Sequence, residues 1–264
     1  MKTEHMKWHK DFMPQSVLAG YRGSQAHGTW RPPTDPTSID DVDIMLVTVG
    51  PLSDYLGFPK QETWERMEDD RSTKLMWDIV AYDIRHFVRL LCKSNPNVLG
   101  MLWLEPNYYT KLTPMGQALI DSRDIFVSKA AYNSFTGYAY SQLHKMTHGA
   151  HKGYMGDKRK KLVDQFGYDT KNASHLIRIQ KMGIEFLSTG RLNVLREDNK
   201  YLVDIKRGVY PLKHIQDESA RLFQLAESAL VNSRLPDRVD EKRAEKLLVN
   251  VLSEHFNVRA ESFK

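Results

Sequence analysis

Three aspartates are the residues of this sequence whose types and spacing best suit catalysis. Asp41 and Asp43 open an apolar run that continues through Ile44–Val49, and Asp78 opens a second one, Ile79–Tyr82. Residues two apart in a strand project from the same face, so the carboxylates of Asp41 and Asp43 should lie side by side. Two such carboxylates repel each other unless a cation lies between them, and Mg²⁺ prefers carboxylate and phosphate oxygens. The pattern therefore predicts a magnesium site.

A glycine–serine pair precedes these aspartates. Gly23 and Ser24 follow a short apolar run, Val17–Ala19, which indicates a strand, a tight turn and the start of a helix. Glycine lets the backbone approach a ligand closely, and the free N–H groups at a helix start favour an anion. Taken alone, the pair is a common turn, and an Asp-x-Asp at a strand edge is often only solvated. Their order here, with a third carboxylate strand to follow, favours a phosphate site beside the metal.

A helix is expected over Lys171–Leu187, and ionisable residues recur along one stripe of it. His175, Arg178 and Glu185 lie near that stripe. The stripe is either a solvated face or the wall of a cleft. In a cleft, Arg178 would bind a triphosphate as a planar fork, Lys171 would act as a point charge, and His175 would contact the nucleotide or its acceptor.

Positive charge concentrates in the stretch Lys145–Lys161, where a tyrosine and glycines are interleaved. It is either a solvated helix end or loop, or a surface that contacts the phosphates of a nucleic acid. The net charge of +5 permits a polyanionic partner without requiring one. The candidate nucleic-acid contacts are Lys145, Lys152, Lys158, Arg159, Lys160 and Lys161.

Other polar residues are assigned structural roles. Asp83, at the end of the strand that Asp78 opens, rivals Asp78 as the third carboxylate, but capping the helix that follows is the favoured role. Asp40 should face away from Asp41 by strand alternation. The single cysteine, Cys92, lies in an apolar helix and suits a core position in a reducing cytosol. The histidines between residues 144 and 151 are interrupted by a glycine and crowded by lysines, which disfavours a zinc site.

The elements indicate an α/β (α+β) fold: a small mixed sheet with helices, followed by an all-helical half. We expect domains at 1–126 and 127–264. Strands are predicted near Val17, Ile44 and Ile79, and a short surface helix or mobile loop over Gln61–Ser72. Helices are predicted to follow Asp83, Asn95, Pro114 and Ser128, and then over 171–187, 212–231 and 240–256.

Composition fits an ordinary globular protein. The chain has 264 residues, of which 41% are apolar, enough for a sizeable core. No window is long and apolar enough for a membrane span, and the first residues lack the apolar core of a signal peptide. These features favour a cytoplasmic protein with no membrane partner.

The glycine–serine turn, the Asp-x-Asp strand and the later Asp-Ile-Val strand together resemble the nucleotidyltransferase fold of the DNA polymerase β superfamily. More narrowly, the sequence is similar to RlaP, the RNA-ligase-associated family of predicted nucleotidyltransferases of bacteria and their phages. The pieces that carry the similarity run from Val17 to about Gly208 and include Asp83–Leu91, Ala131–Met146 and Tyr168–Gly190. The gap between Ser24 and Asp41 is longer than the family's usual form because of a proline-rich insert, 31–37.

This resemblance implies a Mg²⁺-dependent transfer of NMP from an NTP, with ATP among the candidates, to a hydroxyl. Asp41 and Asp43 would hold two metal ions, with Mn²⁺ able to replace Mg²⁺, and Asp78 would hold the catalytic ion and help to deprotonate the acceptor. Gly23 and Ser24 would hold the β and γ phosphates. The resemblance also favours the cleft interpretation of Lys171, His175 and Arg178.

The acceptor is left open by the sequence. The family's association with RNA ligases and the basic stretch favour an RNA 3′ end, such as tRNA under repair. A protein hydroxyl, as in antitoxin-type relatives, or a small-molecule hydroxyl is the alternative. A non-catalytic nucleic-acid-binding module is a further one, against which the three carboxylates Asp41, Asp43 and Asp78 argue. The sequence does not predict which NTP is used or the oligomeric state.

Overall fold

A computed structural model describes residues 3–58, 61–148 and 157–258. The chain divides into two compact units. The sheet unit comprises Met1–Ala26, Asp41–Phe126 and Val239–Lys264, and the helical unit comprises His27–Asp40 and Val127–Arg238. The chain therefore leaves the sheet unit twice and returns to it twice.

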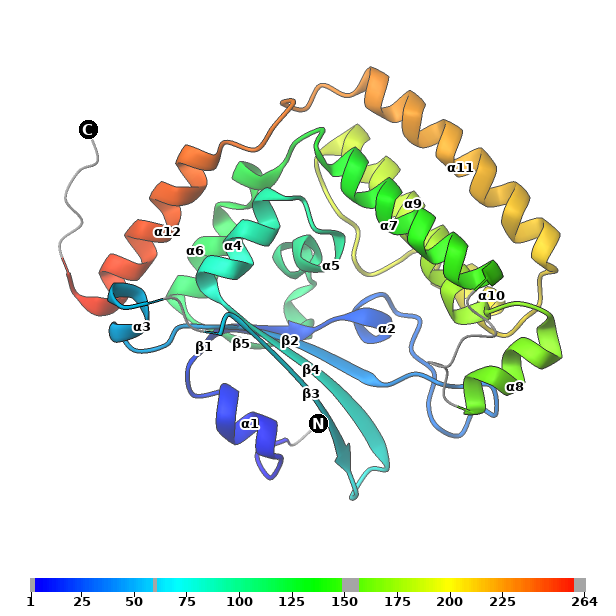
Figure 1. The fold of residues 1–264 in the computed structure, drawn as a ribbon, viewed down its shortest axis with the longest axis horizontal. Coiled ribbons are helices and arrows are strands. Elements are labelled where there is room, and N and C mark those ends of the chain that lie inside the picture. Colours follow the sequence, from blue (N-terminus) through cyan, green and yellow to red (C-terminus); the bar gives the residue numbers. More distant parts are fainter. Residues whose placement is uncertain (1–2, 59–60, 149–156, 259–264) are drawn as a thin grey trace. The chain divides into compact units, whose positions relative to one another are not determined.

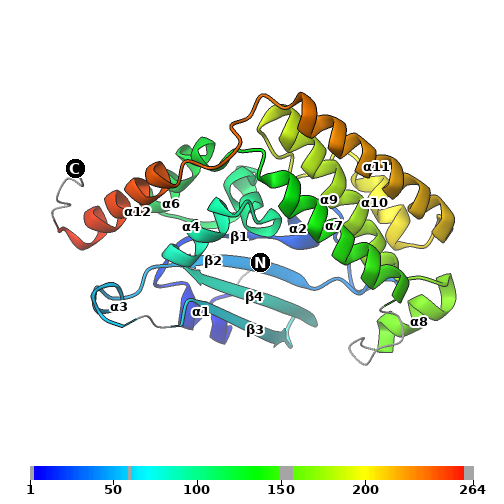
Figure 2. The same cartoon turned by 45° about the horizontal axis from the view of Figure 1, so that its top comes forward.

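The sheet unit is built on five strands in the order β3-β4-β2-β1-β5. Figure 2 shows β3, β4, β2 and β1 side by side in that order. The parallel pair is formed by β2 (Val42–Thr48) and β4 (Leu75–Asp83). The other neighbours are antiparallel, namely β1 (Ser16–Tyr21) with both β2 and β5 (Tyr109–Leu112), and β3 (Thr63–Asp70) with β4. The predicted mixed sheet is confirmed. Its centre is covered on both faces, since β2 is buried along nearly its whole length.

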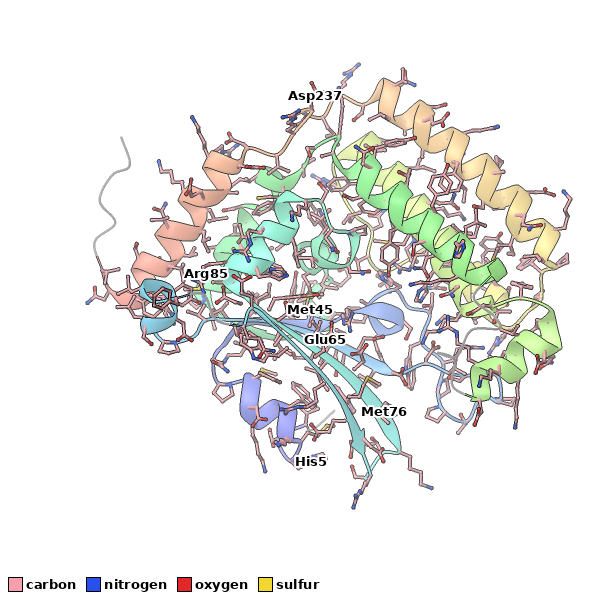
Figure 3. All side chains as sticks on the ribbon, in the orientation of Figure 1. His5, Met45, Glu65, Met76, Arg85 and Asp237 are labelled. Atoms are coloured by element: carbon pink, nitrogen blue, oxygen red, sulfur yellow. The ribbon has the colours of Figure 1, made fainter. Side chains whose placement is uncertain are left out.

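The edge strand β3 replaces the surface helix or mobile loop that the sequence suggested for Gln61–Ser72, and that prediction is wrong. Glu65, Met67 and Asp69 are exposed and alternate with less exposed neighbours, which is the period of a strand. Figure 3 labels Glu65 on β3 and Met76 on β4, along the hairpin that the two strands form. Charged side chains on an edge strand discourage pairing with another chain.

Several helices of the sheet unit begin at a polar side chain that caps them. Asp83 accepts a hydrogen bond from the backbone N–H of Arg85 at the start of α4 (Ile84–Cys92), as predicted. Asn95 and Thr113 cap α5 (Pro96–Leu99) and α6 (Pro114–Asp121) in the same way. The late helix α12 (Glu241–Phe256) packs against α4 and α6 (Figure 1). Short helices of the unit are α1 (Lys7–Phe12), α2 (Gly23–Ala26) and α3 (Ser53–Leu56), together with 3₁₀ helices at Gly100–Trp103, Pro106–Tyr108 and Arg123–Phe126.

The helical unit is organised around α9 (Thr170–Thr189). Asp169 caps the start of this helix, and the helix ends at Gly190, whose backbone is left-handed. Helices α7 (Ala131–His148) and α11 (Leu212–Asn232) pack against it (Figure 2). Gly183 permits a close approach, because a Cβ there would lie 2.9 Å from the Cβ of Phe135 on α7. The remaining helices are α8 (Asp157–Phe166) and α10 (Asn199–Lys206).

The structure divides the chain differently from the predicted domains 1–126 and 127–264. The boundary after residue 126 is present, but the segment 27–40 belongs to the helical unit and residues 239–264 to the sheet unit. The first difference arises because Asp40 is buried against Lys206 of α10, and the second because α12 packs on α4. Among the described residues, none of the helices combines the length and apolar character that crossing a bilayer needs.

Candidate active site

Three neighbouring strands bring Arg22, Asp43 and Asp78 side by side. Tyr21 of β1 pairs with Ile44 of β2, so Arg22 lies opposite Asp43, and its backbone N–H donates to the carbonyl oxygen of Asp43 at 3.0 Å. On the other side of β2, Asp43 pairs with Asp78 of β4 in parallel register. Residues that pair directly across strands project from the same face. The carboxylates of Asp43 and Asp78 are therefore neighbours, as a shared metal site requires.

Arg22 is a participant that the sequence analysis missed. Its Nη2 donates to Oδ2 of Asp78 at 2.9 Å, while its buried Nε has no hydrogen-bond partner among the described residues. The side chains are 26% and 35% exposed, so water screens the pair only in part. The available signal was the position of Arg22 directly before the glycine–serine pair, but its meaning depends on strand register.

Asp41 lies just before β2, two residues from Asp43, and is half-buried. Across the described ranges, no three His, Cys, Asp or Glu side chains are gathered as a metal-binding group. The structure thus supports a pair, Asp43 with Asp78, and leaves the predicted three-carboxylate set of Asp41, Asp43 and Asp78 as a prediction.

The glycine–serine turn adjoins this pair. Gly23 has a left-handed φ of 57°, and a Cβ there would lie 2.1 Å from Oδ2 of Asp43, so only glycine fits against that carboxylate. Ser24 is buried, and its hydroxyl has no hydrogen-bond partner within the described residues. A buried hydroxyl without a partner costs free energy that a ligand oxygen would recover.

These observations fit a divalent cation with a bound phosphate. Adjacent carboxylates supply the hard oxygen ligands that Mg²⁺ prefers, and the unsatisfied hydroxyl of Ser24 is a donor for a phosphate oxygen. The backbone at Gly23 makes room beside Asp43 that any side chain would fill.

Asp83, the rival carboxylate, has a structural role. Besides capping α4, its side chain accepts hydrogen bonds from Tyr55 at 2.9 Å and from the Nε of Arg85 at 2.9 Å. The Tyr55 pKa is raised by burial and by the negative charge of Asp83. The carboxylate of Asp83 is thus engaged by three donors and buried.

We expect Asp78→Ala to abolish the nucleotidyl transfer that the sequence resemblance implies, while the protein stays folded. Asp83→Ala should instead lower the free energy of unfolding, by about 1–2 kcal/mol for the lost cap, and leave turnover largely intact. Paired activity and thermal-melting measurements on the two variants distinguish these roles. An active Asp78→Ala with an inactive, stable Asp83→Ala would show that the assignments are reversed.

In the helical unit, α9 carries Lys171, His175 and Arg178. Arg178 is 7% exposed, with Nη1 lying 3.3 Å from the sulfur of Met182, so the solvated-face interpretation is wrong for this residue. The ammonium group of Lys171 donates to the carbonyl oxygen of Ile39 at 3.3 Å. The three residues stand within one positively charged region of the unit, because Arg178 and Lys171 both act electrostatically on His175.

Burial lowers the pKa of His175 well below its usual value, and the positive charges of Arg178, Lys171 and Lys206 lower it further. The pKa of His27 is lowered in the same way by burial and by Arg178. Nδ1 of His27 donates to the carbonyl oxygen of Val194 at 2.8 Å, which places its proton on Nδ1. Both histidines are therefore neutral in the folded protein near pH 7.

Acid should destabilise the helical unit. The pKa of a histidine in the unfolded chain is about 6.5, and the pKa values of His27 and His175 in the folded protein lie below that. As the pH falls through about 6.5, the unfolded chain binds protons that the folded protein does not bind, so the free energy of unfolding decreases. Each histidine contributes a slope of up to about 1.4 kcal/mol per pH unit. Urea unfolding between pH 7.5 and 5 measures this slope. His175→Gln should reduce it. An equal slope in wild type and His175→Gln would contradict the assignment.

The insert between Ser24 and Asp41 is held by a buried ion cluster that the sequence did not indicate. Nζ of Lys206 lies 2.8 Å from Oδ1 of Asp40 and donates to the carbonyl oxygen of Thr29 at 3.0 Å. Nε of Arg31 lies 3.6 Å from Oδ2 of Asp40, and its Nη1 donates to Thr37 at 2.6 Å. The Asp40 side chain has no exposed surface. Burial lowers the pKa of Lys206 to about 8, against the opposing effect of Asp40.

The basic stretch is only partly described. Lys145, Lys160 and Lys161 are exposed. Arg159 instead places its Nε and Nη2 at 2.8 and 2.7 Å from Oδ2 of the buried Asp169, which caps α9. The position of Arg159 is therefore fixed by a structural ion pair. Lys152 and the side chain of Lys158 lie outside the described part of the chain.

The class of protein follows from the family that its sequence matches. In this sheet a glycine–serine turn lies beside the strand that carries Asp43, and that strand is parallel to the one that carries Asp78. This arrangement is typical of polymerase-β-type nucleotidyltransferases. The sequence matches the family described as "RNA repair pathway DNA polymerase beta family", RlaP, over residues 3–206. The chain belongs to the RlaP family, and the resemblance noted from the sequence is confirmed.

Two further comparisons add little. No curated protein matches the chain in sequence. Among solved structures, a nucleotidyltransferase-like protein from Exiguobacterium sibiricum matches with 11% identity and a TM-score of 0.30, covering 96% of this chain and 79% of that one. A similarity of this size carries no weight for the function.

Proposed function

We propose that the protein is a Mg²⁺-dependent nucleotidyltransferase that transfers NMP from an NTP to the 3′ hydroxyl of an RNA. Membership of an RNA-repair family of the polymerase β class supports the reaction type. The single observation that carries the site is the register that places Asp43 opposite Asp78, beside Gly23 and the unsatisfied hydroxyl of Ser24.

In this proposal the acceptor hydroxyl attacks the α-phosphorus of the NTP and pyrophosphate leaves. Asp41, Asp43 and Asp78 would hold the metal, which when bound neutralises phosphate charge and stabilises the attacking and leaving oxygens. Ser24 donates a hydrogen bond to a phosphate oxygen, and Gly23 lets the backbone approach it. Lys171, His175 and Arg178 are candidate nucleotide-binding donors of the helical unit. Because His175 is neutral, one of its ring nitrogens can accept a hydrogen bond while the other donates one.

One experiment tests the donor and the acceptor together. The protein is incubated with each α-³²P-labelled NTP and Mg²⁺, in separate reactions with RNA, DNA and total protein, and label transfer is followed on gels. We expect label on RNA, located at the 3′ end by nuclease digestion, and no label when EDTA is present. Label on protein alone would replace RNA with a protein hydroxyl. Absence of label in every reaction would favour a non-catalytic nucleic-acid-binding module.

If the basic stretch contacts RNA, neutralising its exposed lysines should weaken RNA binding. Lys145→Gln, Lys160→Gln and Lys161→Gln should each reduce the log–log salt slope by about 0.7 to 1, the value for one lost phosphate contact. NTP binding should change little. Fluorescence-anisotropy titration of a short RNA at several salt concentrations measures the slope, with the exposed Lys213→Gln as a matched control. Slopes equal to wild type in all three variants would leave the stretch as a solvated surface.

A further inference from the structure

We infer that Arg22 is a built-in counter-cation of the carboxylate pair, which competes with a divalent cation for Asp78. The inference rests on the metal site of the proposed function and extends it to a residue outside the predicted ligand set. Arg22 would thereby set the affinity of the protein for its metal.

The first argument is geometric. Strand β2 lies between β1 and β4, and Arg22 continues the β1 ladder by donating its backbone N–H to Asp43. To reach Asp78 on β4, the side chain of Arg22 must cross β2 on the face from which Asp43 projects. The guanidinium therefore reaches Asp78 on the same face that carries the carboxylate of Asp43, the two residues that would hold a cation.

The second argument is electrostatic. Asp43 and Asp78 are like charges on directly paired residues, an arrangement that destabilises a sheet unless a cation compensates it. Arg22 supplies one positive charge against two negative ones. A divalent cation supplies two and takes carboxylate oxygens directly, so it satisfies the pair better than Arg22 does.

The third argument is that the contact is incomplete. Arg22 makes one hydrogen bond to Asp78, through Nη2, and leaves its buried Nε without a partner in the described residues. Arginine and a carboxylate commonly form two parallel hydrogen bonds, so a single bond with an unsatisfied donor is a weak arrangement. A half-exposed pair of this kind is displaced at low cost.

The test measures metal binding without turnover. Mn²⁺ is titrated into the nucleotide-free protein, and free Mn²⁺ is followed by electron paramagnetic resonance. Arg22→Gln removes the competing charge, so we expect Mn²⁺ to bind about three- to tenfold more tightly than in wild type. Arg22→Lys keeps the charge but has no planar fork, and should lie between the two. Metal-free Arg22→Gln should melt at a lower temperature than wild type, and saturating Mn²⁺ should restore it.

Arg66→Gln is the matched control. Arg66 also forms one half-exposed ion pair, with Asp11 at 2.7 Å, but it pairs across strands with Ile79, whose side chain projects from the face opposite to Asp78. Its loss should leave Mn²⁺ affinity unchanged. In an Asp78→Asn background, Arg22→Gln should change the Mn²⁺ affinity little, because the carboxylate for which Arg22 and the metal compete has been removed.

The outcomes separate the inference from the proposed function. If wild type binds Mn²⁺ and Arg22→Gln binds it equally or more weakly, Arg22 does not compete with the metal and the inference is overturned while the metal site stands. If neither wild type nor Arg22→Gln binds Mn²⁺, the metal site itself is overturned, and the inference with it.

Discussion

Asp43→Asn is expected to reduce the rate of nucleotidyl transfer by roughly 10³-fold, because a bound metal contributes several kcal/mol to the transition state and 1.36 kcal/mol corresponds to tenfold. The fold should be unchanged or slightly more stable, since the substitution removes one of two adjacent negative charges. The measurement is label transfer at saturating Mg²⁺, together with thermal melting.

Asp11→Asn controls for the loss of a carboxylate elsewhere in the same unit. Asp11 is half-exposed and pairs with Arg66, away from Asp43, so its substitution should leave the transfer rate unchanged. If Asp43→Asn turns over at the wild-type rate, Asp43 is not a metal ligand, and the role that the family implies for this residue is contradicted. A variant that is both inactive and unfolded would instead assign Asp43 a structural role, which the melting curve reveals.

Lys206→Met should lower the free energy of unfolding of the helical unit by about 3–5 kcal/mol, the usual cost of leaving a buried charge without its partner. Asp40 has no exposed surface, and Lys206 is its closest cation. The expected loss is therefore large for a single substitution of a lysine. Urea unfolding followed by circular dichroism at pH 7 measures it.

The double variant Lys206→Met with Asp40→Asn distinguishes an ion-pair effect from simple loss of packing. Removing both charges should recover part of the stability lost in the single variant, because Asp40 no longer carries a buried charge without its closest cation, while Arg31 loses the carboxylate that lies 3.6 Å from its Nε. Lys213→Met, which breaks an exposed pair with Asp217, should have no measurable effect. A double variant that is less stable than Lys206→Met would show that packing by Asp40 dominates.

The parts of the fold that the sequence predicted correctly are those with local signals. Asp83, Pro114 and Gly190 mark helix ends through capping and backbone geometry, which depend on nearby residues alone. The strands around Ile44 and Ile79 were evident because central strands read as continuous apolar runs.

The missed elements lack such signals. Strand β3 carries charges on its exposed face, so its composition resembles a surface helix or loop, and only pairing with β4 determines its structure. Helix α10 is short, and its first residue has no side-chain cap. Lysine is almost never fully buried, so nothing local marked Lys206 as the residue that holds the insert.

The candidate site shows the same division. Asp41 and Asp43 are neighbours in sequence, and alternation in a strand suffices to place their side chains on one face. Bringing Arg22 to Asp78 requires the order of three strands and the register of two pairs. A single sequence does not contain that information, because a shift of one residue would reverse every side chain.

The division of the chain also bears on the order in which a ribosome can complete the two units. Residues 127–238 of the helical unit emerge together and follow the segment 27–40, so that unit is finished once Arg238 is made. The sheet unit begins first but needs α12, which packs against α4 and α6 and is translated after residue 240. Domains usually fold in the order of their synthesis. Here the unit that carries the carboxylates is started first and completed last, so a nascent chain stalled before α12 would already hold a finished helical unit and an unfinished sheet unit.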